Sequence, residues 1–584
     1  MKIPKIPLAQ TVVKLCELKG IQHIVISPGS RNAPLIIGFS NNSFFKCYSI
    51  VDERSAAFFA LGIAQQTQTP VALVCTSGSA LLNYYPAIAE AYYSNIPLVI
   101  LSADRPKYLL GIGDGQTIDQ NDVYGKHVVY SVNLKEDLVE KNQFVNDEPT
   151  IIKSIENRFE KYIGLQENIQ NENENEVNKA LNLAISDSGP VHINIPFNEP
   201  LYEMVDDYTL NPINIEPKLN NSKTNSNELQ ELVNDWNKSS KKLILVGTLP
   251  PNTIEQKWLD NLAGDDSLIV FTETTSNLHH IDFFPSIDKI IMPLDDSELK
   301  HLQPEILLTI GGMIVSKKIK AFLRNHQPKQ HWHISLHKAN DTFFCLNKRL
   351  KGNPNTFLSQ FLPLVINNKS EYKQFWNNVK EIRAQKHQRY LKDISFSDLK
   401  AFEIILKSIP DHTMLQVGNS SPIRYTQLFD LNKNVNVFCN RGASGIDGCS
   451  STAIGSAVAA EVPTILITGD LGFLYDSNAL WNNYIKDNFR IILINNGGGG
   501  IFRILPGHKN TENFDNYFET IHNKNAKHLC DMFNFEYQSV ANENDLQKQI
   551  DSFYDQSEKP KLLEVFTPRT ENDSVLLNYF QKIK

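Results

Sequence analysis

Short apolar runs alternate with amphipathic stretches along the first 200 residues. The apolar runs are 21–27, 71–79, 96–106 and 191–197. Two of the stretches between them, 51–66 and 79–94, have the periodicity of helices. Continuous apolar strands separated by helices are typical of a parallel sheet that is covered on both faces. This part of the chain is therefore predicted to be an α/β domain.

The same alternation returns twice further along the chain. The second set of strand-like runs is 242–247, 267–273, 289–294, 305–312 and 331–337, and the third is 413–420, 436–441, 464–470 and 490–496. A polar stretch at 218–228 is interpreted as a linker, and the Asn/Glu-rich stretch 165–182 as a solvated helix face or an insertion. We predict an α/β fold of three doubly wound parallel-sheet domains, with boundaries at 1–200, 201–365 and 366–584.

Composition and charge narrow the class of protein. The chain has 584 residues, of which 41% are hydrophobic, and a formal net charge of −8 from 57 basic and 65 acidic side chains. That balance argues against a dedicated nucleic-acid-binding protein. No apolar run reaches the roughly 20 residues that span a bilayer, and the N-terminus lacks the pattern of a signal peptide. The seven scattered cysteines are never spaced as C-x-x-C, which favours a reducing cytoplasm over a disulfide framework or a zinc site.

Polar residues gather where the predicted strands end. These segments are rich in Gly, Ser, Asn, Asp and Arg, and they are 26–31, 75–80, 102–106, 417–424, 440–448, 468–473 and 494–502. Ligands of parallel α/β sheets bind at the carboxyl ends of the strands. Glycine permits close backbone approach, and free N–H groups at helix starts attract phosphate. A large anionic ligand is therefore predicted.

Two strand ends in the third domain carry oxygen ligands. Asp470 follows one strand and Asn496 follows the next, about one helix and one strand later. A doubly wound sheet returns such residues to neighbouring positions, and a carboxylate, an amide oxygen and a loop carbonyl suit Mg²⁺. The alternative is that Asp470 caps a helix and that the Asn-Asn-Gly-Gly sequence forms a turn. The residues alone leave both open.

Glu53 is a second candidate, at the start of the helix predicted within 51–66. A carboxylate there either complements the helix dipole or serves as a buried acid that hydrogen-bonds a heterocycle nitrogen. The pattern does not decide between them.

Together these features resemble the thiamine-diphosphate-dependent enzyme family. The shared features are Glu53 in the first domain and the Gly-Asp and Asn-Asn pairs in the third. The order of a pyrimidine-binding, a central and a diphosphate-binding domain is also the same. More narrowly, SPGSRNAPL (27–35), DERSAAFFALG (52–62), NRGASGIDG (440–448) and GDLGFLYDSNAL (469–480) are similar to the carboligases of menaquinone biosynthesis, as are 76–106 and the Gln116 segment. The resemblance covers both terminal domains and is weak in the central one.

The resemblance implies a reaction and a set of roles. These transferases decarboxylate 2-oxoglutarate and add the resulting succinyl carbanion equivalent to isochorismate, with thiamine diphosphate and Mg²⁺, or Mn²⁺ as an alternative. The implied catalytic residues are Glu53, which also hydrogen-bonds the aminopyrimidine, and Gln116. The implied metal ligands are Asp470, Asn496 and the Gly498 carbonyl. Ile446, wedged under the cofactor, joins Glu53, Asp470, Asn496, Ile501 and Phe502 in the implied cofactor site.

The two implied substrates are both dicarboxylates, for which guanidinium clamps are the expected device. Four arginines stand at or just after predicted strand ends, and three neutral side chains match them. The implied substrate residues are Arg31, Arg105, Arg424, Arg441, Ser30 and Ser420, with Gln116. For any single arginine, a surface ion pair is the alternative.

Three departures from the family pattern stand out. Leu471 replaces a glycine of the wider superfamily, a variation that the narrower family shares. Gly497 stands where Asn or Asp is expected, although the Gly498 carbonyl should survive as a ligand. The stretch 272–280 lacks the expected central-domain pattern, so no central-domain residue is assigned.

Two other interpretations stay open. One is a different thiamine-diphosphate-dependent 2-oxoacid decarboxylase or an acetolactate-synthase-like carboligase. The other is a non-catalytic sensor on the same fold, which Glu53 disfavours. The resemblance also implies a cytoplasmic homodimer or homotetramer with each active site between subunits, and no nucleic acid or membrane partner.

Overall fold

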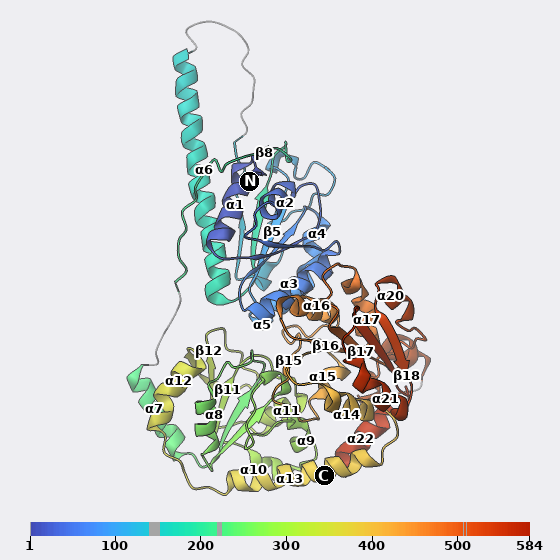
Figure 1. Ribbon diagram of the computed structural model, residues 1–584. Coiled ribbons are helices and arrows are strands. Elements are labelled where there is room, and N and C mark those ends of the chain that lie inside the picture. The colour runs from blue at the N-terminus through green and yellow to red at the C-terminus, as the bar shows by residue number, and fades with distance from the viewer. Residues whose placement is uncertain (1, 139–151, 219–224, 506, 508, 510) are drawn as a thin grey trace. The chain divides into compact units, whose positions relative to one another are not determined.

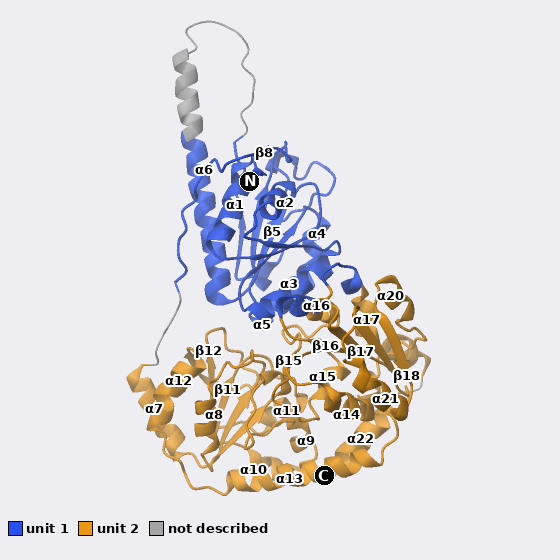
Figure 2. Cartoon of the chain, in the orientation of Figure 1, with its two compact units in different colours: residues 1–219, 454–460, 478–484 blue, residues 220–453, 461–477, 485–584 orange. Residues whose placement is uncertain are grey.

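The computed structural model describes residues 2–138, 152–218, 225–505, 507, 509 and 511–584 (Figure 1). The chain divides into two compact units (Figure 2). Unit 1 comprises 1–219, 454–460 and 478–484, and unit 2 comprises 220–453, 461–477 and 485–584. The linker predicted at 218–228 lies partly outside the described residues.

Unit 1 is built on a six-stranded parallel sheet in the order β3-β2-β4-β5-β7-β6. Its strands are β2 (His23–Ile26), β3 (Lys46–Ser49), β4 (Val71–Cys75), β5 (Leu98–Asp104), β6 (Tyr130–Asn133) and β7 (Val191–Pro196). The four predicted strands are confirmed. The sequence pattern does not predict β3 and β6, which are edge strands with few apolar residues. A short antiparallel pair, β1 (Ile3–Pro4) and β8 (Met204–Val205), lies outside this sheet.

Helices flank the unit 1 sheet. They are α1 (Pro7–Leu18), α2 (Ala33–Ser40), α3 (Glu53–Thr67), α4 (Ser79–Asn83), α5 (Tyr85–Ser94) and α6 (Ile152–Asp187), with short 3₁₀ turns η1 (Lys107–Leu109) and η2 (Gly125–His127). The Asp52 side chain caps α3 by accepting a 3.0 Å hydrogen bond from Ser55 N. The helices predicted at 51–66 and 79–94 are confirmed, the second as two consecutive helices.

The Asn/Glu-rich stretch 165–182 is part of the long helix α6 (Figure 1). Its apolar face is buried in the unit 1 core, and two of its asparagines are buried as well. Asn173 Oδ1 accepts from Lys135 N at 2.9 Å, and Asn178 binds the backbone of Ile213 and Ile215 at 2.9 Å. This polar stretch therefore anchors two connecting segments in addition to facing solvent.

Unit 2 contains a five-stranded parallel sheet in the order β10-β9-β11-β12-β13. Its strands are β9 (Lys242–Val246), β10 (Leu268–Thr272), β11 (Ile306–Ile310), β12 (Gln330–Ser335) and β13 (Leu346–Lys351). The strand predicted at 289–294 is wrong, because residues 289–291 belong to α9 (Ile287–Ile291), where Ile287, Ile290 and Ile291 are buried, and the rest form a turn. A short apolar run cannot be distinguished from a buried helical turn by its pattern alone.

Unit 2 also contains a six-stranded parallel sheet in the order β15-β14-β16-β17-β19-β18. Its strands are β14 (Met414–Val417), β15 (Asn436–Phe438), β16 (Thr464–Gly469), β17 (Phe489–Asn495), β18 (Glu536–Val540) and β19 (Lys561–Phe566). The four predicted strands are confirmed, whereas β18 and β19 are not predicted.

Helices pack against each of the two parallel sheets of unit 2. They are α7 (Ser226–Lys238), α8 (Gln256–Ala263), α9, α10 (Asp296–Leu302), α11 (Lys317–Asn325), α12 (Pro354–Phe361), α13 (Tyr372–Lys392), α14 (Asp398–Ser408), α15 (Ser421–Thr426), α16 (Cys449–Ala459), α17 (Asp470–Tyr475), α18 (Ile501–Ile504), α19 (Glu512–Phe514), α20 (Lys527–Met532), α21 (Glu543–Phe553) and α22 (Asn572–Lys582), of which the end of α16 belongs to unit 1. Short turns are η4 (Thr274–Ser276), η5 (Leu362–Leu364) and the π-helical η7 (Asp515–Glu519), whereas η6 (Ser477–Leu480) belongs mostly to unit 1. The third predicted domain begins with two helices, α13 and α14.

The two six-stranded sheets have the same topology. Counted in chain order, the strands of each sheet are arranged 2-1-3-4-6-5, and those of the five-stranded sheet 2-1-3-4-5. In each case the strand order reverses between the first and third strands. The carboxyl ends of that strand pair form the crevice in which α/β sheets bind ligands. The three parallel sheets confirm the predicted fold class. Within the part of the chain that the structure describes, no helix combines the length and apolarity needed to cross a membrane.

Candidate functional site

Hydrogen bonds of Asp470 link the ends of two strands of unit 2, β16 and β17. It follows β16 directly, begins α17 and is 4% exposed. Its Oδ1 accepts from Leu471 N at 2.7 Å, and its Oδ2 accepts from Gly497 N at 2.9 Å and Gly498 N at 3.0 Å. The carboxylate therefore lies against the loop that follows β17, as the spacing of Asp470 and Asn496 predicts.

Asn496 adds a buried oxygen at the same place. Its Nδ2 donates to Asp398 Oδ2 at 3.1 Å. Its Oδ1 is buried and accepts no hydrogen bond from any of the residues described. Buried polar atoms are nearly always satisfied, so an unpartnered amide oxygen next to a buried carboxylate fits the oxygen-only shell of Mg²⁺. Burial raises the pKa of Asp398 to about 6, and its hydrogen bonds from Thr567 and Asn496 oppose that rise.

The loop 497–500 needs glycine at position 498. Gly498 has φ +152°, and a Cβ there would lie 2.6 Å from Glu519 O. The Gly498 carbonyl accepts from Gly500 N at 3.0 Å, which leaves its second lone pair for a cation. Gly497 has φ +77°, with a Cβ position 3.4 Å from His522 O. The position therefore favours glycine or asparagine by its backbone conformation.

His522 is a residue of this site that the sequence analysis missed. Its backbone N donates to Gly497 O at 3.1 Å, and its Nε2 lies 3.3 Å from Asp470 Oδ2. Its Nδ1 accepts from Lys524 N at 3.2 Å, so in the neutral ring the proton belongs on Nε2, facing the carboxylate. No local motif marks His522, because it reaches the loop from a segment after η7.

The structure places Ile446 beside the same strand end. A Cβ on Gly472 would lie 3.7 Å from Ile446 Cβ, so Ile446 packs near the start of α17. Asn419, which the sequence analysis did not single out, holds this loop by donating from Nδ2 to Asn440 O and Gly445 O, both at 2.7 Å.

Ile501 and Phe502 begin α18, immediately after the glycine loop. The Phe502 ring is partly exposed, and its centroid lies 6.0 Å from that of Phe518. The structure thus brings the proposed metal ligands, Ile446 and the start of α18 to one edge of the six-stranded sheet of unit 2.

In unit 1, Glu53 is half-buried at the first position of α3. Burial raises its pKa, Asp52 adds to the rise, and its own backbone N–H opposes it. Its carboxylate also adds to the raised pKa values of Cys75 and Tyr84, for which burial is the main cause. Glu53 therefore lies near the end of β4, in surroundings that favour a protonated carboxyl more than water does.

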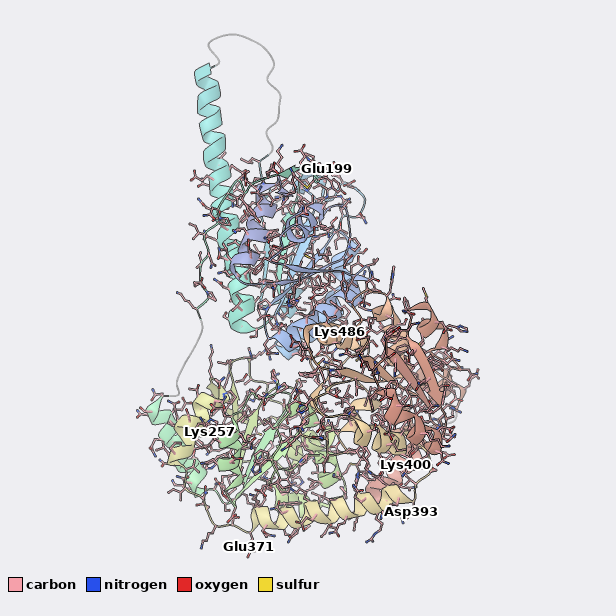
Figure 3. All side chains as sticks on the ribbon, in the orientation of Figure 1. Glu199, Lys257, Glu371, Asp393, Lys400 and Lys486 are labelled. Atoms are coloured by element: carbon pink, nitrogen blue, oxygen red, sulfur yellow. The ribbon has the colours of Figure 1, made fainter. Side chains whose placement is uncertain are left out.

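Arg31 follows the end of β2 and is 8% exposed. Its Nη1 donates to Phe197 O at 3.1 Å, and its Nη2 lies 3.4 Å from Glu199 Oε1, on a mostly exposed side chain (Figure 3). Its Nε is buried and has no hydrogen-bond partner among the described residues. Ser30 is exposed beside it.

Arg105 brings the Gln116 segment to the end of β5. Its Nη1 donates to Ser77 Oγ at 2.6 Å and to Gln116 O at 2.9 Å, and its Nε donates to Asp114 Oδ2 at 2.7 Å. Gln116 has φ +55° and an exposed side chain. Gln120, which the sequence analysis missed, accepts from Gly78 N at 2.9 Å.

Arg424 and Arg441 lie close together in unit 2. Arg424 Nη1 donates to Ser420 O at 2.6 Å, and Arg441 Nη1 donates to Asn419 Oδ1 at 2.7 Å. Burial lowers the pKa of Arg424, and the charge of Arg441 lowers it further. The two guanidinium groups therefore repel each other in a half-buried setting, which an anion would relieve.

The five-stranded sheet adds two charged residues that were not predicted. Glu273 follows β10, is 2% exposed, and accepts from Val315 N and Ser316 N, both at 2.9 Å. Burial raises its pKa to about 7, and Arg441 is among the groups that lower it. Burial and then Arg441 lower the pKa of Lys320 on α11, whereas Glu273 raises it. The position of Glu273 at a strand end is a signal that could have identified it.

Two closely spaced histidines of β12 have a common polar partner. His331 Nε2 and His333 Nδ1 lie 2.9 and 2.8 Å from Thr309 Oγ1. Among the residues with described positions, no group of three or more His, Cys, Asp or Glu side chains could hold a metal ion. A metal at Asp470 would therefore depend on amide and carbonyl oxygens.

The predicted site residues form two sets. Ser30, Arg31, Glu53, Arg105 and Gln116 belong to unit 1, and the others belong to unit 2. Each set lies at or just after the carboxyl ends of strands in a six-stranded sheet.

Two protein families match the chain. Residues 6–123 match "Thiamine pyrophosphate enzyme, N-terminal TPP binding domain", and residues 417–565 match "Thiamine pyrophosphate enzyme, C-terminal TPP binding domain". Pyrophosphate and diphosphate are two names for the same group.

Curated relatives match over the whole length. A 2-succinyl-5-enolpyruvyl-6-hydroxy-3-cyclohexene-1-carboxylate synthase of Christiangramia forsetii is 55% identical over 100% of both chains. The protein of that name from Flavobacterium psychrophilum is 53% identical, also over 100% of both chains. The one from Bacteroides thetaiotaomicron is 34% identical over 98% of each chain.

Proposed function

The chain belongs to the 2-succinyl-5-enolpyruvyl-6-hydroxy-3-cyclohexene-1-carboxylate synthase family, and from this premise we propose its substrates, its metal and the roles of its residues. It is a thiamine-diphosphate-dependent carboligase and a transferase. It decarboxylates 2-oxoglutarate and adds the succinyl unit to isochorismate, which releases CO₂ and yields the product in the family name, a step of menaquinone biosynthesis. The observation that carries the proposal is the buried Asp470 carboxylate beside the unpartnered Asn496 oxygen, at a strand end of a thiamine-diphosphate-binding domain.

Unit 2 supplies the groups for the diphosphate end of the cofactor. The Asp470 carboxylate, Asn496 Oδ1 and the Gly498 carbonyl would hold Mg²⁺, with Mn²⁺ as a substitute. Their support is the donor set itself, which is all oxygen and mostly buried. Ile446, at the side of α17, and Ile501 and Phe502, at the start of α18, would contact the rest of the cofactor.

Unit 1 supplies the acid for the ring end of the cofactor. Thiamine diphosphate, when bound, provides the electron sink that allows a 2-oxo acid to lose CO₂. Glu53 would hold a proton on its carboxyl oxygen and share it with a nitrogen of the aminopyrimidine ring. The raised pKa of Glu53 supports this role, because a protonated carboxyl can donate a hydrogen bond at neutral pH.

The arginines would bind substrate carboxylates. Arg441 and Arg424 are mutually repelling and half-buried, so an incoming carboxylate would lower their electrostatic free energy. Arg31 keeps a buried Nε without a partner among the described residues. Arg105, Ser30, Ser420 and Gln116 would complete the hydrogen bonding. A pyruvate-consuming enzyme would need fewer such groups.

A coupled consumption assay tests the proposal. The purified chain is incubated with thiamine diphosphate, Mg²⁺, 2-oxoglutarate and isochorismate, with omission of each component in turn. Loss of isochorismate that requires all the others is the expected result. If the cofactor binds but only pyruvate or another 2-oxo acid is consumed, the substrate assignment is wrong.

Two further expectations belong to this proposal. We expect a homodimer or homotetramer that shares its active sites between copies, which sedimentation analysis would measure. We also expect a cytoplasmic location, because none of the seven cysteines, which all lie in the described part of the chain, forms a disulfide.

A further inference from the structure

We propose that Asp398 is a positioning residue that fixes the amide of Asn496 so that its oxygen, and not its nitrogen, faces the cation. This inference rests on the metal site of the proposed function. Asp398 is 2% exposed at the first position of α14, the helix that also carries Lys400 (Figure 3). It lies far from Asn496 in sequence, and neither residue type alone suggests the pairing.

Asp398 is held by three elements, two of which bind its carboxylate and one its backbone N–H. Its Oδ1 accepts from Thr567 Oγ1 at 2.6 Å, just after β19, and its Oδ2 accepts from Asn496 Nδ2 at 3.1 Å, just after β17. Its backbone N donates to Asn572 Oδ1 at 2.8 Å, at the start of α22. The carboxylate therefore presents one oxygen to Asn496 from a fixed position.

The chemistry of the pair determines which way the amide points. The two ends of an asparagine side chain have nearly the same size, and a half-turn exchanges the oxygen with the NH₂ group. An ionised carboxylate only accepts hydrogen bonds. A turned amide would set its oxygen against Asp398 Oδ2 and present an NH₂ group, which cannot coordinate Mg²⁺, to the metal site. Asp398 therefore excludes the unproductive orientation.

The neighbouring Asn495 is also oriented by a buried acid, but its amide oxygen has a hydrogen-bond partner. Asn495 Nδ2 donates to Glu564 Oε1 at 2.7 Å, and Glu564 is 0% exposed. The Asn495 oxygen, however, accepts from Gly497 N at 3.1 Å. Both amides are oriented by buried acids, but only the Asn496 oxygen lacks a partner among the described residues. Glu564 thus supports the shape of the loop, and Asp398 supports the ligand.

The test measures metal binding separately from turnover. Mg²⁺ is titrated into the full chain with saturating thiamine diphosphate, and the apparent Kd is read by calorimetry and by tryptophan fluorescence. Asp398→Asn allows both amide orientations, so the apparent Kd for Mg²⁺ is expected to rise about 10- to 100-fold, the usual effect of losing a partner of a metal ligand. An unchanged Kd overturns the inference.

Thr567→Val is the matched control. It removes the other buried hydrogen bond of the same carboxylate and leaves the contact with Asn496 in place. We expect a loss of thermal stability with a Kd within about 3-fold of the wild type, well below the loss typical of a disrupted ligand partner. An equal rise in Kd for both variants would mean that Asp398 acts only through general stability, which contradicts the proposal.

An exchange of the two residues covers the case in which Asp398→Asn fails to fold. In the double variant Asp398→Asn with Asn496→Asp, the NH₂ group of the new asparagine donates to a carboxylate that presents oxygen to the metal in either orientation. Mg²⁺ binding should return to within about 10-fold of the wild type, since the partner of the ligand is kept. A folded exchange variant without Mg²⁺ binding overturns the inference. Absence of Mg²⁺-dependent cofactor binding in the wild type would instead overturn the proposed metal site itself.

Discussion

The six-stranded sheets of unit 1 and unit 2 share one strand order but differ in the chemistry at their carboxyl edges. In unit 1 the edge carries Glu53, whose pKa is raised and which lies near the buried Cys75 and Tyr84. In unit 2 the corresponding edge carries Asp470 and an unpartnered amide oxygen on Asn496. The two sheets therefore share a topology, and the proposed difference between their sites comes from the side chains at the edge.

Arg105 of unit 1 and Arg441 of unit 2 differ in how many hydrogen bonds their guanidinium groups already make. Arg105 in unit 1 already makes three hydrogen bonds to its own unit, to Asp114, Ser77 and Gln116. Arg441 in unit 2 makes one hydrogen bond to Asn419, and its Nε has no partner among the described residues. We infer that Arg105 mainly shapes a loop, whereas Arg441 has more capacity for a substrate carboxylate.

The largest effect is expected at the acid of unit 1. Glu53→Gln removes the shared proton but keeps the size of the side chain, so kcat should fall by about 10²- to 10⁴-fold, the usual contribution of a positioned acid. Mg²⁺-dependent binding of thiamine diphosphate should persist, because that end of the cofactor belongs to unit 2. Steady-state kinetics and calorimetry measure the two quantities, and an active variant would remove Glu53 from the catalytic set.

Substitution of the proposed metal ligand Asp470 in unit 2 should weaken cofactor binding, which Glu53→Gln should leave in place. Asp470→Ala removes a charged ligand, so cofactor affinity at fixed Mg²⁺ should fall by about 100-fold, at the upper end of the losses seen even for partners of metal ligands. Raising the Mg²⁺ concentration should partly restore binding. Unchanged affinity would mean that Asp470 only caps α17.

A smaller effect is expected at the paired arginines. Arg441→Lys keeps the charge but loses the planar fork, so KM for 2-oxoglutarate or isochorismate should rise about 10-fold, equivalent to about 1.4 kcal/mol, with little change in kcat. Arg349→Lys, on the edge strand β13, is the control and should leave KM unchanged. Equal effects of the two variants would argue against a substrate role.

The last prediction concerns the stability of the fold and not catalysis. Glu273 has a folded-state pKa of about 7 against an ordinary value of 4.5. The folded state therefore binds more protons between these values, and the free energy of unfolding falls as pH rises through this range. Comparison with Glu273→Gln by urea titration at pH 5 and pH 8 isolates the effect. The wild type should lose roughly 2 kcal/mol relative to the variant, and a constant difference would contradict the assignment.

The sequence predicts most interior strands, although it misses the interior strand β19, and it predicts the edge strands β10 and β15 but not the more polar ones. The run at 71–79 is apolar because β4 is buried on both faces. The edge strands β3, β6, β13 and β18 contain many polar residues, and the pattern does not reveal them. The run at 289–294 shows the reverse error, because a single buried helical turn has the same composition as a short strand.

The residues of the candidate site also form two groups. Some are identified by the sequence pattern, and others are placed there only by the tertiary structure. The strand-end rule and the spacing of Asp470 and Asn496 are properties of the sequence, and they identify neighbours because parallel strands end at a common edge. Asp398, His522 and Glu273 reach the site regions from other segments, through packing that no local pattern records.

The sequence by itself determined the alternation of strands and helices, the three-sheet class and the residue types at the strand ends, because these depend on local periodicity and on the chemistry of side chains. The tertiary structure alone decided which distant groups face them: the acid that orients Asn496, the histidine beside Asp470, and the strength of burial that shifts Glu53 and Glu273. The reason is physical, since desolvation and hydrogen-bond direction depend on the whole surroundings of an atom and not on its neighbours in the chain.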